Sequence, residues 1–256
     1  MKIEPLKLKQ IVLGEGRPKI CVPLTGRTKE ELCTQAEVAA GTNADLVEWR
    51  VDYYEAWQDN EQVLAVLADI VRNLAGKPLI FTFRTAGEGG EASISRLEYL
   101  SLNLIVAESG LTDLIDVELY FHEDVPALVE AIHLAGGKVI LSNHEFHSTP
   151  PEEELIARLC RMQEIGGDVL KIAVMPQEPL DVTTLLSATA RMYRDYASKP
   201  IVTMSMSGLG TVSRIAGSVF GSAMTFGTAG QTSAPGQVDI DRLEQALDLL
   251  QVKSRA

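Results

Sequence analysis

Short apolar runs alternate with longer amphipathic stretches along the chain. Eight runs rich in Val, Ile and Phe predict strands, at 19–23, 45–51, 79–84, 114–119, 138–144, 169–174, 201–207 and 223–227. Helix-start residues stand at the head of the stretches between them. We predict helices after Thr28, Asp59, Ser95, Asp124 and Thr149 and over 181–197 and 239–250, with a shorter link over 213–219.

This alternation predicts the fold class. Eight strands and about eight helices in 256 residues are typical of an α/β protein, a single-domain (β/α)₈ TIM barrel. A doubly wound open sheet is the competing interpretation. It needs a glycine-rich phosphate turn after its first strand, which KICVPLTGRT lacks, and no GxxxxGK[ST] pattern occurs. We therefore expect one catalytic barrel domain over 1–256, with 1–17 as an N-terminal extension.

Composition narrows the class of partner. The chain has 35 acidic residues against 23 Lys and Arg, for a net charge of −12. This balance argues against nucleic acid or an anionic membrane as the main partner, but a local arginine cluster can still bind a small anionic substrate. No run approaches the roughly 18 apolar residues of a membrane span, and the N-terminus does not resemble a signal peptide. Three cysteines without a CxxC pair predict reduced thiols in a cytoplasmic protein.

Strand alternation aims an unusual set of polar side chains at the barrel interior. The inward set is Glu48, Arg50, Arg84, Asp116, Glu118, His144 and Lys171. Buried charge is costly unless it is paired, so this many charges predict a functional site. The alternative is a set of structural ion pairs in which Asp116 and Glu118 are partners of the arginines and the lysine.

Lys171 is the most specific single feature of the set. It lies in mid-strand between Leu170 and Ile172. Burial disfavours the ammonium form, and a neutral amine attacks carbonyl groups, so Lys171 is a candidate for Schiff-base catalysis. A charged lysine paired with Asp116 or Glu118 is equally compatible with its position.

His144 ends the fifth strand, where active sites of such barrels gather, and it is a candidate general acid and base. Its neighbour Glu145 points to the opposite face, so we expect Glu88, from another loop, to orient it. The i, i+3 spacing of His144 and His147 differs from the HExxH pattern, and we predict no metal site.

Two loops complete the predicted site. Residues 228–237 form a long, polar segment that we interpret as an active-site lid, in which Ser233 and Gln237 could bond a hydroxylated ligand. A plain surface loop is the alternative. Arg214 follows Gly208-Leu-Gly210 after the seventh strand, where its guanidinium could bind a carboxylate through two hydrogen bonds.

Six segments together resemble a known family. They are DLVEWRVD (45–52), FTFRTAGEGGE (81–91), SNHEFHSTP (142–150), LKIAV (170–174), MSGLGTVSR (206–214) and TAGQTSAPGQ (228–237). In this order they resemble type I 3-dehydroquinate dehydratase, from about residue 18 to the C-terminus. That resemblance implies a homodimeric barrel of the shikimate pathway of aromatic amino acid biosynthesis. It also implies a lyase that converts 3-dehydroquinate to 3-dehydroshikimate through a lysine Schiff base, without metal or cofactor.

The resemblance also implies a role for each site residue. Lys171 would form the Schiff base, His144 would be the acid and base, and Glu88 its partner carboxylate. The substrate-binding positions would be Glu48, Arg50, Arg84, Arg214, Ser233 and Gln237. One position departs from the pattern, because Pro23 stands where some members place a substrate-binding serine.

Two other functions fit the residues. A Schiff-base class I aldolase would share Lys171 but cleave a carbon–carbon bond, usually of a phosphorylated sugar. A non-catalytic barrel could bind a carboxylate metabolite, with Lys171 held in a salt bridge.

Overall fold

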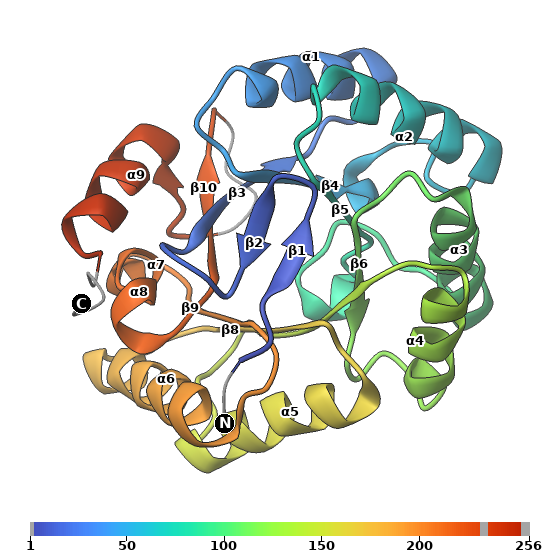
Figure 1. The fold of residues 1–256 in the computed structure, drawn as a ribbon. Coiled ribbons are helices and arrows are strands. Elements are labelled where there is room, and N and C mark those ends of the chain that lie inside the picture. The colour runs from blue at the N-terminus through green and yellow to red at the C-terminus, as the bar shows by residue number, and fades with distance from the viewer. Residues whose placement is uncertain (1–2, 231–234, 252–256) are drawn as a thin grey trace.

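The computed structural model describes residues 3–230 and 235–251, and its centre is a closed parallel barrel (Figure 1). Its strands are β3 (Lys19–Leu24), β4 (Leu46–Arg50), β5 (Leu79–Thr82), β6 (Leu114–Glu118), β7 (Val139–Glu145), β8 (Val169–Val174), β9 (Ile201–Ser205) and β10 (Met224–Thr228). Each strand from β3 to β8 pairs in parallel with the next, and β10 pairs in parallel with β3. Between β9 and β10, the Ala223 N–H donates to the Ile201 carbonyl at 2.7 Å. The predicted α/β barrel is confirmed.

Helices surround the barrel (Figure 1). They are α1 (Lys29–Ala40), α2 (Asn60–Asn73), α3 (Arg96–Ser109), α4 (Val125–Leu134), α5 (Glu152–Ile165), α6 (Pro179–Arg191), α7 (Thr211–Ile215), α8 (Gly217–Phe220) and α9 (Ile240–Leu249). Several predicted caps are present: the Thr28 hydroxyl accepts from the Glu31 N–H, and Ser95 forms a capping box with Glu98. The predicted helix starts at these positions are therefore correct.

The predicted start of α6 is wrong by two residues. Asp181 is not the cap but the third helical residue, and its carboxylate accepts the Glu178 N–H at 3.3 Å. Pro179 opens the helix, a position where its missing N–H leaves no hydrogen bond unmade. Beyond Arg191 the chain continues as a π-helical turn, η3 (Met192–Tyr196), up to Ala197, where the predicted helix ended.

Strand alternation separates two hydrophobic clusters. One lies between barrel and helices and includes Val47, Phe81, Val117 and Ile172. The other lies inside the barrel and contains residues from the starts of the strands, Cys21, Leu46, Ile80, Leu114, Ile140 and Val169. The predicted inward and outward faces of these strands are therefore correct. The charged inward positions follow the apolar ones along each strand, toward the carboxyl end.

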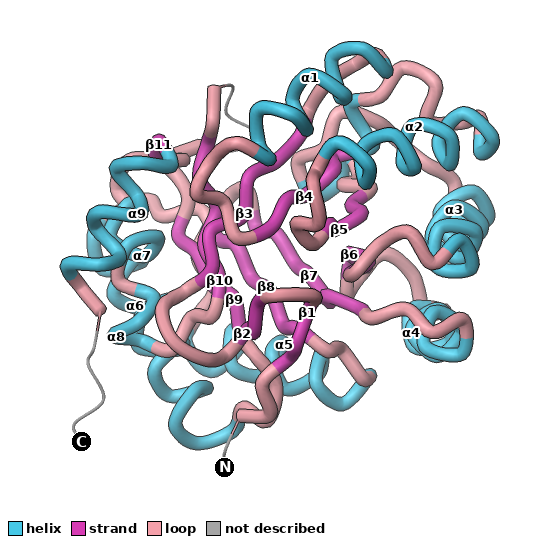
Figure 2. Tube along the Cα trace, turned by 45° about the horizontal axis from the view of Figure 1, so that its top comes forward, coloured by secondary structure: helices cyan, strands magenta, loops and turns pink. Residues whose placement is uncertain are grey.

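An N-terminal hairpin closes the amino end of the barrel. Strands β1 (Leu6–Leu8) and β2 (Ile11–Leu13) pair antiparallel, and Figures 1 and 2 show them across this opening. Leu8, Ile11 and Leu13 pack on the interior cluster. The sequence predicts 1–17 only as an N-terminal extension, because three-residue strands carry little periodic signal. With this end closed, the site opens at the carboxyl end.

Three further short elements were not predicted from the sequence. The 3₁₀ turns η1 (Val51–Tyr53) and η2 (Ala86–Glu88) follow β4 and β5, and strand β11 (Val238–Asp239) pairs in parallel with β10. Each lies beside the carboxyl end of the barrel, and η2 carries Glu88. They are too short for a periodic pattern, but they shape the loops of the site.

Shortening one buried side chain of the N-terminal hairpin tests how much this hairpin stabilises the barrel. Leu13 is fully buried, and Leu13→Ala should lower the free energy of unfolding by about 3 kcal/mol through a cavity at the closed end of the barrel. Urea denaturation followed by circular dichroism measures the loss. Val12→Ala, one position along and only partly buried, should cost under about 1 kcal/mol. An equal loss of unfolding free energy in the two variants would contradict the stabilising role of the hairpin.

Candidate active site

A pocket of about 490 Å³ opens at the carboxyl end of the barrel. Polar residues on its wall are Glu48, Arg50, Arg84, Glu88, His144, Lys171, Arg214 and Gln237. Apolar side chains complete the lining, from Phe146, Ala173, Met204, Met206 and Phe226. The structure thus brings together every predicted site residue except Ser233, which lies outside the described residues. A concave wall of apolar side chains with a few converging polar groups is typical of a small-molecule site.

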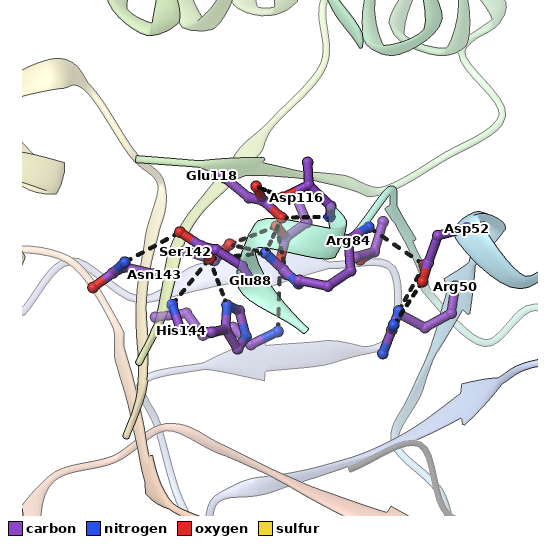
Figure 3. Close-up of polar contacts among 12 residues, drawn as sticks. Arg50, Asp52, Arg84, Glu88, Asp116, Glu118, Ser142, Asn143 and His144 are labelled. Carbon is purple, nitrogen blue, oxygen red and sulfur yellow. Dashed lines mark hydrogen bonds and ion pairs between the residues drawn. The ribbon is translucent and has the colours of Figure 1, made fainter. Parts of the chain in front are cut away.

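Arg84 is the centre of a buried ion-pair network (Figure 3). Its guanidinium lies 2.9 Å from Asp116 Oδ1 and 2.9 Å from Glu118 Oε1, and it donates to the Ser142 hydroxyl at 3.0 Å. Burial alone would lower the pKa of Arg84, but the carboxylates around it raise that pKa above its usual value. Burial likewise opposes ionisation of Asp116, yet Arg84 and Lys171 hold the pKa of Asp116 below its usual value. These contacts favour the ionised forms of Arg84 and Asp116.

Lys171 lies loosely between two carboxylates. Its Nζ is 3.5 Å from both Glu48 Oε1 and Asp116 Oδ2, the long limit for a hydrogen bond. The Phe226 ring centre lies 4.6 Å from Nζ. Only 4% of Lys171 is exposed, and its side chain lines the pocket. Of the two carboxylates expected as partners, Asp116 makes the contact, while Glu118 binds Arg84 and Thr85. The Lys171 side chain is therefore paired with two carboxylates at long distance and is not held in a short salt bridge.

His144 and Glu88 form a hydrogen-bonded pair whose side chains are 10% and 12% exposed (Figure 3). Nδ1 lies 2.9 Å from Glu88 Oε2, and the same oxygen accepts the His144 backbone N–H at 2.9 Å. Burial, reinforced by Arg84, Lys171 and Arg50, lowers the pKa of His144 well below its usual value, so the ring is neutral at pH 7. With the proton assigned to Nδ1 from this contact, Nε2 carries a lone pair. The arrangement suits a general base.

The pKa of Glu88 is set by burial and by neighbouring groups that act in opposite directions. Burial raises its pKa to about 8, against the opposing effect of Arg84, whose guanidinium lies 3.4 Å away. Asn143 Nδ2 donates to Oε1 at 3.1 Å and also favours the charged form. Two titrating groups this close exchange protons as a unit. Small changes around Glu88 therefore decide when Nε2 of His144 is free to take a proton.

Arg50 and Arg214 differ sharply in their partners. Arg50 binds Asp52 through two hydrogen bonds of 2.8 and 2.7 Å. Arg214, in α7, is 1% exposed. Its Nη2 donates to the Pro235 carbonyl at 2.9 Å and its Nη1 to Met204 Sδ at 3.8 Å, and its Nε has no hydrogen-bond partner in the described part of the chain. No carboxylate within residues 3–230 and 235–251 lies within 4.0 Å of its guanidinium. Burial lowers its pKa to about 10. Arg214 is thus a buried cation available to an anion in the pocket.

Two glycines allow close backbone approaches beside Arg214. A Cβ at Gly210 would lie 2.0 Å from the Ser205 carbonyl oxygen, so no larger residue fits the turn that begins α7. Gly236, in the predicted lid, has φ +76° and would place a Cβ 2.2 Å from the Ser207 oxygen. The end of the 228–237 loop is therefore packed on the loop after β9, and Gln237 reaches the pocket.

Several residues of the site were not identified from the sequence as partners. Asp52 binds Arg50 and also accepts the backbone N–H groups of Arg84 and Glu91. Asn143 contacts Glu88 from the helix-facing side of β7. Alternation places Asn143 outside the barrel, and it could have been found only by knowing that η2 folds over the end of β7. Within the described residues, no three His, Cys, Asp or Glu side chains are grouped to hold a metal ion.

Charge-removing variants distinguish the two kinds of buried arginine. Arg214→Met should raise the free energy of unfolding by about 1 kcal/mol, because it removes an unpaired buried cation. Arg84→Met should instead cost about 4 kcal/mol, because it leaves Asp116 and Glu118 buried without their counter-charge. Chemical denaturation of both variants measures the difference. A large loss of stability on Arg214→Met would show that this guanidinium serves the fold rather than a ligand.

Comparison with known proteins gives one consistent family. A sequence model described as "Type I 3-dehydroquinase" matches residues 20–254. The chain is 52% identical over 244 residues to the 3-dehydroquinate dehydratase of Klebsiella pneumoniae, across 95% of this chain and 97% of that protein. It is 48% identical over 246 residues to the enzyme of that name from Clostridioides difficile, across 96% of both.

Solved structures agree. The type I 3-dehydroquinate dehydratase of Clostridium difficile, solved with covalent modified comenic acid, superposes with a TM-score of 0.94 at 47% identity and covers 97% of this chain and 98% of that one. The 3-dehydroquinate dehydratase of Geobacillus kaustophilus superposes with a TM-score of 0.95 at 36% identity and covers 98% of both chains. These matches span almost the whole barrel, and this chain belongs to the type I 3-dehydroquinase family.

Proposed function

We propose that this protein converts 3-dehydroquinate to 3-dehydroshikimate through an imine on Lys171. The observation that carries the proposal is the placement of a loosely paired buried amine, a neutral imidazole and an unpaired guanidinium on one pocket. Relatives of about 50% identity bear the name of this activity. A role in the shikimate pathway of aromatic amino acid synthesis follows from membership of the family.

Lys171 begins the proposed reaction by attacking the substrate ketone. Loss of water gives a cationic imine between Glu48 and Asp116, which lie at 3.5 Å from Nζ and can balance its charge. The iminium draws electrons from the adjacent carbon and so acidifies its proton. These two carboxylates thus stabilise the positive charge that the covalent intermediate carries on its iminium nitrogen.

His144 then moves the proton. Its Nε2 removes the proton beside the iminium, and Glu88 on Nδ1 stabilises the imidazolium that forms. The enamine expels the β-hydroxyl, which takes a proton from His144 and leaves as water. Hydrolysis of the conjugated imine releases product and restores the Lys171 amine.

The remaining residues position the ring. We propose that Arg214 binds the substrate carboxylate through two hydrogen bonds, and that Gln237 and Ser233 contact its hydroxyls from the lid. Glu48, Arg50 and Arg84 are proposed to line the other side of the ring. Because Arg84 is committed to Asp116 and Glu118, its share in binding is smaller than that of Arg214. We also propose that the whole chain forms one catalytic domain.

A Schiff-base aldolase is the alternative chemistry. It would use Lys171 in the same way but must hold a phosphate. The unpaired cation on the pocket wall among the described residues is Arg214, whose planar guanidinium matches one carboxylate. The apolar lining from Met204, Met206 and Phe226 suits a ring rather than an extended sugar phosphate. Dehydration is therefore the better-supported reaction.

Borohydride trapping tests the proposed imine. Protein incubated with 3-dehydroquinate and then reduced should carry an adduct with the mass of the dehydrated product, and peptide mapping should place it on Lys171. Lys171→Ala should form no adduct and lose at least about a 10⁴-fold factor in kcat, because the covalent route is closed. A variant that kept near-normal turnover would refute the imine.

His144→Ala separates imine formation from proton transfer. It should still be trapped on Lys171 by borohydride, but turnover should fall by about 10²–10⁴-fold, because the base is lost. Stopped samples analysed by mass spectrometry give both quantities. If the adduct vanished while circular dichroism showed an intact fold, His144 would be needed for imine formation instead.

We also propose that the protein is a cytoplasmic homodimer. The resemblance to the family supports the dimer, and Cys21, Cys33 and Cys160 are free thiols, as suits a reducing compartment. No helix in the described part of the chain is long and apolar enough to cross a membrane. Sedimentation equilibrium should give twice the mass of the chain at micromolar concentration. The mass of one chain across that range would contradict the dimer.

A further inference from the structure

A polar chain reaches the catalytic pair from outside the barrel. Asn143 lies on β7, and its side chain faces the surrounding helices rather than the pocket. It is 3% exposed. Its Nδ2 donates to Glu88 Oε1 at 3.1 Å, and its Oδ1 accepts from Arg158 Nη1 at 2.6 Å. Figure 3 shows the inner part of this chain, from Asn143 through Glu88 to His144.

Arg158 decides which way the amide of Asn143 points. A guanidinium only donates hydrogen bonds, so the atom of Asn143 that faces it must be the acceptor Oδ1. The opposite atom, which faces Glu88, is then the donor Nδ2. Without Arg158 the amide could turn over and place Oδ1 against Glu88, and that arrangement favours a protonated carboxyl group. The arginine therefore selects a donor toward the carboxylate.

Arg158 is itself held in place on α5. Its guanidinium binds Glu154 one turn earlier on the helix and lies 3.4 Å from Glu145. It also lies over the Tyr120 ring, 5.6 Å from the ring centre. Its side chain is 14% exposed and does not line the pocket. An arginine so constrained can fix the orientation of the amide it touches.

We propose that Arg158 and Asn143 are positioning residues that favour the ionised form of Glu88, and with it the form of His144 that carries its proton on Nδ1 and leaves the Nε2 lone pair free to act as a base. The proposal rests on the proposed function, because the lone pair affects the reaction rate only if His144 removes a proton from the substrate. It concerns neither substrate contact nor the covalent step.

In addition to the Asn143 amide, several charged groups shift the pKa values of Glu88 and His144. The charged groups that face Glu88 and His144 are Arg84 in the loop after β5, Asp116 and Glu118 of β6, Arg50 of β4 and Lys171 of β8. None of them is altered by a change at Arg158 or Asn143. The burial that raises the pKa of Glu88 leaves its ionisation sensitive to the loss of one donor.

Two variants and a matched control test the proposal. Arg158→Met and Asn143→Leu should each move the acid limb of the pH profile of kcat/KM upward by about one pH unit, which lowers kcat/KM about tenfold at pH 7. The rate should recover to within about twofold at the alkaline plateau. Arg161→Met is the control, because Arg161 lies on the same helix, is 56% exposed and bonds Glu164 alone. It removes the same charge and should not move the profile.

The double variant tests whether Arg158 acts through Asn143. Adding Arg158→Met to Asn143→Leu should cause no further shift, because the amide that it orients is gone. A fall in kcat/KM that is equal at every pH, or shifts that add in the double variant, would overturn the proposal.

A measurement without substrate separates this proposal from the proposed function. The chain has four histidines, so ¹⁵N-histidine spectra can resolve the ring of His144. In the parent protein the Nδ1–H form with a bare Nε2 should appear about one pH unit lower than in Arg158→Met. The same titration in both proteins would overturn the positioning role. A shifted titration in a protein without dehydratase activity would refute only the function.

Discussion

The pairing of Arg84 with Asp116 and Glu118 is the interaction on which the rest of the site depends. A barrel interior cannot hold isolated charges, because each loses its hydration and gains nothing in return. Arg84 offsets two carboxylates at 2.9 Å, and Asp116 can then lie beside Lys171 without excess negative charge. Ser142 joins the same group. The network thus allows an amine to be buried at the carboxyl end of the barrel without being locked in a short salt bridge.

Arg214 is a second buried guanidinium, but unlike Arg84 it has no carboxylate partner within the described residues. Its guanidinium is as deeply buried as that of Arg84, yet its hydrogen-bond partners in the described residues are the Pro235 carbonyl and the Met204 sulfur, neither of which carries a charge. Burial of such a cation costs solvation free energy that two uncharged partners do not fully offset, so its position makes sense through an anionic ligand that pairs with it. Because the Pro235 carbonyl belongs to the 228–237 loop, the same arginine links the end of this loop to the pocket wall. Binding of an anion and placement of the loop are therefore coupled through one side chain.

Much of this site could be predicted because strand geometry leaves little freedom. Side chains alternate with a period of two, so the inward position of Lys171, Glu48 and Arg84 followed from the sequence, and the structure agrees. Glu88 and Arg214 come from loops, where no periodicity applies. Arg214 was found by its position after a strand, and Glu88 by the search for a histidine partner, with family resemblance supporting both.

The pairing of charges could not be predicted in the same way. Which carboxylate meets which cation depends on the stagger between neighbouring strands, and that stagger places Glu118 on Arg84 rather than on Lys171. Asn143 was overlooked because it faces outward, and its contact with Glu88 exists only because η2 folds over the end of β7. The hairpin over 6–13 was missed because its apolar residues gain their role only when the strands meet as a barrel.

The most direct measurement of the central claim is a crystal structure of the protein soaked with 3-dehydroquinate and reduced with borohydride. The account predicts a continuous bond from Lys171 Nζ to a ring carbon, the ligand carboxylate on the Arg214 guanidinium, and Nε2 of His144 within hydrogen-bond distance of the carbon that loses its proton or of the departing hydroxyl. A ligand bound without a bond to Lys171, or with its carboxylate on Arg50 or Arg84 while Arg214 stays unpaired, would contradict it.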